Sequence, residues 1–149
     1  MSEDLYALIR LKKWEIDEKR RALADLFSQE EKVINNIKKL LEELEEEKRT
    51  AALDIQYRIT YDIYVQKNIK IRQSLDGILI KTRQRIQEVQ DELAILFQDL
   101  KTYEISQENR EKRRAEELKI KEQNKLDEIG LNLHRRRHND ENHENDEEI

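Results

Sequence analysis

The sequence contains no cysteine, no proline and only two glycines. Without cysteine, the chain can form neither a disulfide nor a thiolate metal site, as is typical of a cytosolic protein. Without proline, nothing in the chain forces a long helix to break. Aromatic residues make up only 5% of the chain and charged residues 42%, which is too polar for the rounded core of an ordinary domain. We therefore expect one elongated domain.

Further absences restrict the location and the partners of the protein. The N-terminal residues lack the basic and then apolar pattern of an export signal, and no run approaches the roughly 18 apolar residues of a membrane span. These absences predict a cytoplasmic protein that does not insert into a membrane. Residues 139–149 are rich in acids and hold no lysine or arginine, so the rest of the chain is nearly neutral despite a net charge of −5. This balance argues against nucleic acid as a partner, because nucleic-acid binders usually show a basic face.

Two long stretches of the chain carry apolar residues at alternating steps of three and four, which is the spacing of a coiled-coil seam. The first seam consists of Leu23, Leu26, Phe27, Val33, Ile34, Ile37, Leu40, Leu41 and Leu44. The second consists of Leu75, Leu79, Ile86, Val89, Leu93, Leu96, Phe97, Leu100 and Tyr103. Each seam predicts a long helix, and the two helices can bury their seams against each other. The predicted fold is all-α, a long antiparallel two-helix coiled-coil hairpin.

The hairpin is expected to occupy residues 1–138 as a single domain, with helix one at about 3–50 and helix two at about 60–133. Ser2 is a suitable N-terminal cap for helix one, and Gly130 is a residue type that favours the C-terminal end of helix two. The pairing places residue 5 opposite residues 105–110. Helix two then overhangs from about Arg110 onward, and residues 139–149 form a disordered acidic tail.

The tip of the hairpin is expected at about 51–59. Apolar and polar residues alternate from Ile55 to Ile63, which by period alone predicts a strand. No second strand is available to pair with it, and Ile55, Ile59 and Ile63 also have the i, i+4 spacing of a helix. We therefore interpret the segment as a short turn followed by helix two, with Thr60 or Asp62 as the cap.

The sequence contains no recognisable catalytic constellation. It has no nucleophile paired with histidine, no glycine-rich phosphate loop and no pair of metal-binding histidines within a known motif. Its three histidines, His134, His138 and His143, lie among acids, but their spacing fits no compact set of metal ligands. We expect no enzyme activity, no cofactor and no metal.

The N-terminal turns offer a candidate binding surface. On a helical wheel, Leu11 and Trp14 lie well away from the seam, where a two-helix hairpin would leave them exposed. Exposed tryptophan and leucine are plausible anchors for a partner protein. Two alternatives remain open: the C-terminal overhang folds back over them, or the chain dimerises there. The basic run from Arg110 to Lys121 is compatible with a phosphate contact, but we favour a solvated helix face with i, i+4 ion pairs.

Two segments of the chain resemble the FliJ family of flagellar type III export proteins. The first is LIRLKKWEIDEKRRALADL near the start, and the second is FQDLKTYEISQENREKRRAEELKIKEQNKLDEIGL in the return helix. The most distinctive part is Glu122–Gly130. The resemblance covers nearly all of the hairpin and excludes the acidic tail.

The resemblance implies a cytoplasmic antiparallel coiled coil, similar in shape to the central stalk of rotary ATPases and peripheral to the inner-membrane export apparatus. Its implied partners are the export ATPase hexamer, the export-gate membrane protein and export chaperones. The paired termini would enter the ATPase ring as a non-catalytic stalk or adaptor, and the tip residues Tyr57, Tyr61 and Tyr64 would face the gate. The implied partner-binding residues are Leu8, Leu11, Trp14, Arg113, Arg114, Glu122, Gln123, Leu126, Asp127 and Glu128.

Two other functions remain compatible with the pattern. One is a generic coiled-coil scaffold or homodimer, which the oligomeric state would distinguish. The other is a helical arm that contacts RNA, which would need basic side chains gathered at the tip. The tip segment DIQYRITYDIYVQ has few basic residues.

Overall fold

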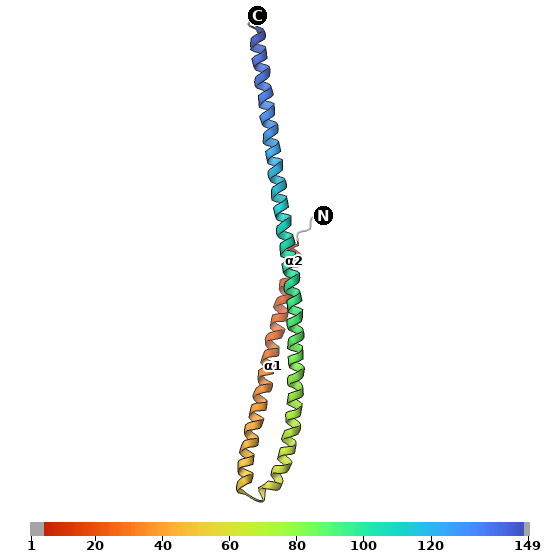
Figure 1. Cartoon of the computed structure of the whole chain (residues 1–149), viewed down its shortest axis with the longest axis vertical. Coiled ribbons are helices and arrows are strands. Elements are labelled where there is room, and N and C mark those ends of the chain that lie inside the picture. The colour runs from red at the N-terminus through yellow and green to blue at the C-terminus, as the bar shows by residue number, and fades with distance from the viewer. Residues whose placement is uncertain (1–4, 148–149) are drawn as a thin grey trace. The chain divides into compact units, whose positions relative to one another are not determined.

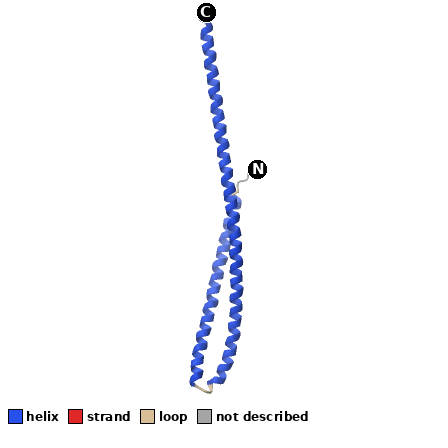
Figure 2. Ribbon diagram, in the orientation of Figure 1, coloured by secondary structure: helices blue, strands red, loops and turns tan. Residues whose placement is uncertain are grey.

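The computed structural model describes residues 5–147, so the expected cap at Ser2 and the expected start of helix one near residue 3 lie outside the described residues. The chain forms two helices, α1 (Tyr6–Leu53) and α2 (Tyr57–Glu147), as Figures 1 and 2 show. Residues 5–147 include no strand. The all-α fold expected from the sequence is confirmed.

The structure divides into two compact units, which we describe separately. The first unit is Ala7–Lys101, and the second combines the described parts of Met1–Tyr6 and Thr102–Ile149. Within the first unit, α1 and α2 lie side by side and run in opposite directions (Figure 1). The antiparallel hairpin is therefore confirmed for this unit.

The core of the hairpin unit is a thin seam between the two helices. Its buried apolar side chains are Ile9, Ile16, Val33, Ala51, Ile86 and Val89. Val89 is completely buried, whereas Phe27, Leu41 and Phe97 at the edge of the seam remain exposed. Two helices cannot surround a wide stripe of side chains, so only the centre of each predicted seam is covered.

The register of the antiparallel pairing agrees with the expected one. In the hairpin unit, Lys19 Nζ lies 2.5 Å from Glu92 Oε2, and Arg83 Nε lies 3.5 Å from Glu30 Oε2. In the second unit, the Leu5 amide donates to Gln107 Oε1 at 2.8 Å. Residue 5 therefore pairs within the predicted range of 105–110.

Two polar side chains are buried in the hairpin seam. Asn68 Nδ2 donates to the Leu40 carbonyl on α1 at 3.3 Å, and Thr82 Oγ1 donates to the Ile78 carbonyl within α2 at 2.8 Å. A buried polar group is tolerated when it has a hydrogen-bond partner, and one asparagine in a coiled-coil seam favours a single register. Asn68 therefore links the two helices at one position.

The turn of the hairpin is shorter than expected. Only residues 54–56 separate the helices, where the sequence suggested about 51–59. Asp54 Oδ1 accepts from the Gln56 amide at 3.0 Å, and the Arg58 amide donates to the Ile55 carbonyl at 3.3 Å. Aspartate favours such turns because its side chain satisfies a nearby backbone amide. The turn therefore starts at Asp54, and the prediction of Thr60 or Asp62 as the cap was wrong.

The C-terminal end of α2 also differs from the expectation. The helix continues to Glu147 instead of ending near 133, and residues 139–147 are helical where a disordered tail was expected. Gly130 does not adopt a positive φ, so it does not terminate the helix. No glycine or proline follows it, and glutamate and arginine are good helix formers. Every residue from 111 to 147 is exposed.

Gly77 is a weak point of α2 that a single substitution can remove. A Cβ atom added at Gly77 would meet no heavy atom within 4 Å. Because glycine has a lower helix propensity than alanine, Gly77→Ala is expected to raise the free energy of unfolding of the hairpin by about 1 kcal/mol. Thermal and urea melts followed by circular dichroism measure this change.

Gly130→Ala is the matched control for this prediction. Its added Cβ also meets open space, but Gly130 lies in the exposed part of α2 outside the hairpin unit. It is expected to leave the melting of the hairpin unchanged. Equal shifts in the two variants would show that the melt does not report the local effect at Gly77.

Candidate partner-binding surface

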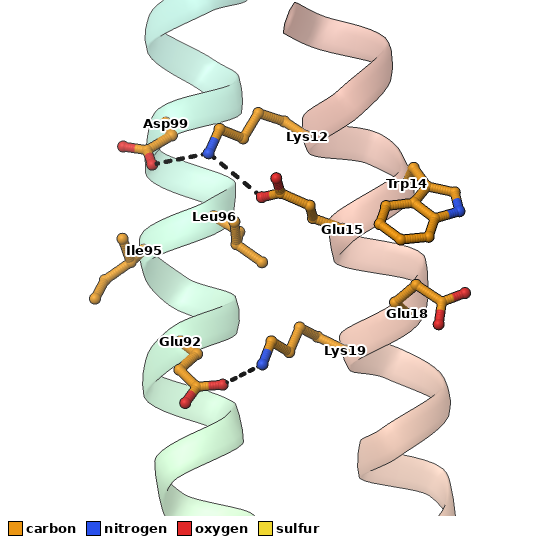
Figure 3. A pocket seen from close by; sticks show the side chains of 9 residues that line it. All are labelled: Lys12, Trp14, Glu15, Glu18, Lys19, Glu92, Ile95, Leu96 and Asp99. Carbon is orange, nitrogen blue, oxygen red and sulfur yellow. Dashed lines mark hydrogen bonds and ion pairs between the residues drawn. The ribbon is translucent and has the colours of Figure 1, made fainter.

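The predicted N-terminal anchors lie on the outer face of α1. Ile9 and Ile16 are buried in the seam, whereas Leu8, Leu11 and Trp14 are exposed. The exposed fraction of Trp14 is 60%, and its ring points away from α2 in Figure 3. The helical wheel therefore placed Leu11 and Trp14 on the correct face.

A hollow of about 490 Å³ lies beside Trp14 in the hairpin unit, and we call it the Trp14 groove. It is lined by Lys12, Trp14, Glu15, Glu18 and Lys19 of α1 and by Glu92, Ile95, Leu96 and Asp99 of α2. Leu96 lies between the two helices, and Ile95 points outward from α2 (Figure 3). The groove therefore combines apolar side chains with a charged rim.

Two lysines bridge the helices across the Trp14 groove. Lys12 Nζ lies 3.3 Å from Glu15 Oε2 and 3.8 Å from Asp99 Oδ2. Lys19 Nζ donates to Glu92 Oε2 at 2.5 Å, as the lower dashed line in Figure 3 shows. This hydrogen bond is the main reason why the pKa of the Glu92 carboxyl lies below its ordinary value of 4.5. Four carboxylates and two ammonium groups line the groove, and Glu18 and Glu92 also pair with Arg21 and Arg85 beside it, so its charges nearly balance.

The lowered pKa of Glu92 predicts a dependence of stability on pH. A carboxyl with a lowered pKa in the folded state stabilises the fold above its unfolded pKa, and this contribution is lost as pH falls through the folded pKa. We expect Glu92→Gln to melt at a lower temperature than the wild type at neutral pH. The difference should disappear as pH falls below 4.5. Thermal melts at several pH values, with Glu31→Gln as an exposed control on α1, measure it. A constant difference at every pH would contradict the ionic origin of the effect.

Sequence reasoning missed most of the residues of the Trp14 groove. It singled out Trp14 but not Lys12, Lys19, Glu92 or Asp99. A usable signal was present, since each pair of like charges is seven residues apart and the two pairs face each other in the predicted antiparallel register. No spacing pattern in the sequence marked Ile95 as a residue of the groove.

The predicted C-terminal residues do not form one surface. Arg113, Arg114, Glu122, Gln123, Leu126, Asp127 and Glu128 are all exposed on α2. Only Glu122 and Leu126 share a hollow, which has about 290 Å³ and is completed by Lys125 and Ile129. At 100° per residue, Asp127 lies about a quarter of a turn or more from both of them. The structure therefore brings together only a part of the predicted set.

A cluster of hydrogen bonds fixes the start of α1 to α2 in the second unit. Gln107, which is 4% exposed, accepts from the Leu5 amide and donates to Glu111 Oε1 at 3.4 Å. The Tyr6 hydroxyl donates to the same oxygen of Glu111. The first amides of a helix lack partners within the helix, so Gln107 satisfies a group that would otherwise need water. Sequence reasoning did not find this cluster.

The tyrosines predicted to face the gate are half-buried at the tip. Tyr57, Tyr61 and Tyr64 share one side of α2, and the Tyr57 hydroxyl donates to Glu47 of α1. This hydrogen bond raises the pKa of the Tyr57 hydroxyl above its ordinary value. The strongly exposed side chains of the tip are aliphatic instead: Leu53, Ile55, Ile59 and Ile63. Sequence reasoning identified the tip but not its exposed chemistry.

Two features are absent from the described residues. Across residues 5–147, no set of three or more histidine, aspartate or glutamate side chains is arranged to hold a metal ion. None of the described helices has an apolar stretch sufficient to span a bilayer.

Comparison with known proteins identifies a family for this chain. The model of the family described as the flagellar FliJ protein matches residues 1–139, which include both helices almost to the end of α2. Neither a curated protein nor a solved structure matches the chain. The family is a non-enzymatic component of flagellar type III protein export. The chain therefore belongs to the flagellar FliJ protein family and has a role associated with flagellar export.

Proposed function

We propose that the protein is a non-catalytic stalk or adaptor of the flagellar type III export apparatus. It acts in the cytoplasm next to the inner-membrane part of that apparatus. Its paired termini enter the ring of the export ATPase hexamer, and its tip contacts the export-gate membrane protein. Export chaperones are further partners of the same hairpin.

One observation carries this proposal beyond family membership: an antiparallel hairpin with exposed Leu8, Leu11 and Trp14 near the start of α1. Side chains of this kind are frequent anchors of protein interfaces, tryptophan above all. The described hairpin presents its side chains on open helix surfaces, which suits contact with a partner.

The tip is proposed as the second contact site. Tyr57, Tyr61 and Tyr64 are half-buried beside the turn, where Tyr57 bonds to Glu47 of α1, and the aliphatic side chains of Ile55, Ile59 and Ile63 are exposed around it. In this arrangement, the isoleucines contact the gate, and the tyrosines hold the backbone that presents them.

The test is the ATPase rate of the export ATPase with and without the purified protein. We expect the protein to stimulate turnover. The double variant Leu11→Ala/Trp14→Ala should need about a tenfold higher concentration for half of the effect, since loss of an interface anchor costs 1–2 kcal/mol or more. The matched control is Ile78→Ala/Ile80→Ala, which removes two side chains of similar exposure from α2.

Two results would contradict the proposal. The first is an equal loss of stimulation in both double variants. It would show that Leu11 and Trp14 contribute no more to the effect than the exposed pair Ile78 and Ile80. The second is absence of any effect on the ATPase together with a stable homodimer in analytical ultracentrifugation, which would favour a structural coiled coil.

A further inference from the structure

We infer that α1 carries an additional coiled-coil seam on one side of the hairpin, through which two copies of this chain associate in antiparallel orientation. The inference goes beyond the proposed function and does not depend on it. On a helical wheel, the members of this seam fall within about 100° of one another. They alternate in steps of four and three, and we call them the outer seam: Arg20, Ala24, Phe27, Glu31, Ile34, Lys38, Leu41 and Glu45.

The apolar members of the outer seam exceed what a two-helix hairpin needs. Phe27, Ile34 and Leu41 are seven residues apart, and each directly follows a more buried residue of the seam between α1 and α2. The exposed fractions are 45% for Phe27 and 39% for Leu41, and Ile34 is half-buried. A pair of helices uses two apolar positions per heptad, whereas a third is typical of helices in larger bundles. This side of α1 therefore fits a further helix.

The charged members of the outer seam favour a second copy as that helix. Their order along the chain is positive, negative, positive, negative: Arg20, Glu31, Lys38 and Glu45. In an antiparallel pairing centred near Ile34, Glu31 of each copy lies beside Lys38 of the other, and Arg20 lies near Glu45. A parallel pairing would bring like charges together. Because a twofold dimer pairs a surface with itself, this order of charges makes the outer seam complementary to its own reverse.

The two central charges of the outer seam are not used within their own chain. Among residues 5–147, neither Glu31 nor Lys38 takes part in an ion pair, and both side chains are exposed. Arg20 differs, because its guanidinium carbon lies 5.2 Å from the centre of the Phe97 ring and its Nη1 lies 3.9 Å from Asp17 Oδ1. The charges at the centre of the seam therefore remain available to a second copy.

The expected contact between the copies is short. The same pairing brings Phe27 of each copy to Leu41 of the other and Ile34 to its own counterpart. From Phe27 to Leu41 the seam spans two heptads, or about 21 Å of helix. A contact of this length is small for a stable dimer, so we expect reversible association that increases with protein concentration.

The experiment is sedimentation velocity of the full-length protein over a wide range of concentrations. We expect a reversible equilibrium between monomer and dimer. Glu31→Lys and Lys38→Glu should each weaken association at least about tenfold, because like charges then meet at both central positions. An equimolar mixture of the two variants should recover association, since every central contact between the two different chains again joins opposite charges.

Matched variants show whether the outer seam itself forms the contact. Glu43→Lys reverses an exposed carboxylate on α1 outside the outer seam and should change association less than twofold. Phe27→Ala should weaken association several-fold. Ile80→Ala removes an exposed isoleucine (58%) of α2 and should change it less than twofold. Circular dichroism verifies that each variant stays folded.

Three results would overturn the inference. They are a chain that stays monomeric at every concentration, equal effects of Glu31→Lys and Glu43→Lys, and a mixture of the two charge variants that associates no better than either alone. The first would mean that this side of α1 is solvated or binds a different protein. The outer seam excludes Leu11 and Trp14, so Glu31→Lys should stimulate the export ATPase normally. Failure of this inference and failure of the proposed function are therefore distinguishable.

Discussion

A chain that ends at Arg110 is expected to lose stimulation of the export ATPase completely while the hairpin stays folded. The truncation removes residues 111–149, of which 111–147 are helical and exposed throughout and therefore contribute no buried side chain. It leaves the whole hairpin unit, Ala7–Lys101, and the hydrogen bond from the Leu5 amide to Gln107. In the proposed function, the removed segment is part of what enters the ATPase ring. ATPase assays and thermal melts on the same sample separate the two effects.

A truncation that removes fewer residues provides the control. A chain that ends after Asn139 loses only the acidic residues beyond the part that matches the family, and it is expected to stimulate the ATPase normally. Full stimulation by the chain ending at Arg110 would refute insertion of the C-terminal helix. A large drop in its melting temperature would instead show that residues 111–147 support the hairpin.

Replacing Val89 with aspartate is expected to have the largest effect on stability. Val89 is the one large side chain of the described residues that is fully buried, and it lies at the centre of the seam of α2. A carboxylate there has neither water nor a partner, so it must either remain charged without compensation or take up a proton. We expect a loss of at least about 3 kcal/mol, measured by urea unfolding followed by circular dichroism.

The control for this prediction is Ile80→Asp, on the same helix but 58% exposed. It introduces the same charge into water and is expected to change the free energy of unfolding by less than about 0.5 kcal/mol. Similar losses in both variants would mean that helix propensity, and not burial, determines the cost. The destabilisation of Val89→Asp should also decrease at low pH, as the new carboxyl becomes protonated.

The sequence was sufficient to predict the hairpin and its register. Apolar residues at steps of three and four define a helix face, and one short turn between two such faces leaves antiparallel pairing as the simple solution. Placing the turn near residue 55 set residue 5 opposite 105–110, and Leu5 does bond to Gln107. The error in the bounds of the turn did not affect the register, because the expected turn at 51–59 and the observed turn at 54–56 are both centred on residue 55.

The tail was predicted incorrectly for a physical reason. Composition describes the average tendency of a segment, and the acidic residues 139–147 lack the apolar side chains that stabilise a packed helix. Here they continue a helix that is already formed, so they need no nucleation of their own. Arg136 and Arg137 also stand four residues before Asp140 and Glu141, a spacing at which opposite charges on a helix attract.

The polar contacts could not be derived from the pattern alone. Asn68 and Gln107 look like ordinary surface residues in the sequence, and their burial depends on a backbone group from the opposite helix. The Trp14 groove likewise depends on which side chains of α1 and α2 come to line the same surface. Each of these features is a relation between two segments far apart in the sequence.

The three-residue turn at 54–56 has a consequence for how the hairpin forms. The contact between Tyr57 and Glu47 spans 10 residues of chain, whereas that between Leu5 and Gln107 spans 102. Closing the longer loop directly would cost about 2 kcal/mol more in chain entropy. Helix pairing that starts at the turn avoids this cost, because each contact formed shortens the loop that remains for the next.

We therefore expect the hairpin to form from the turn toward the chain ends. In that case, substitutions near Asp54 would act mainly on the rate of folding. The hydrogen bond between Leu5 and Gln107 would form last, and the start of α1 would be the first part to fray.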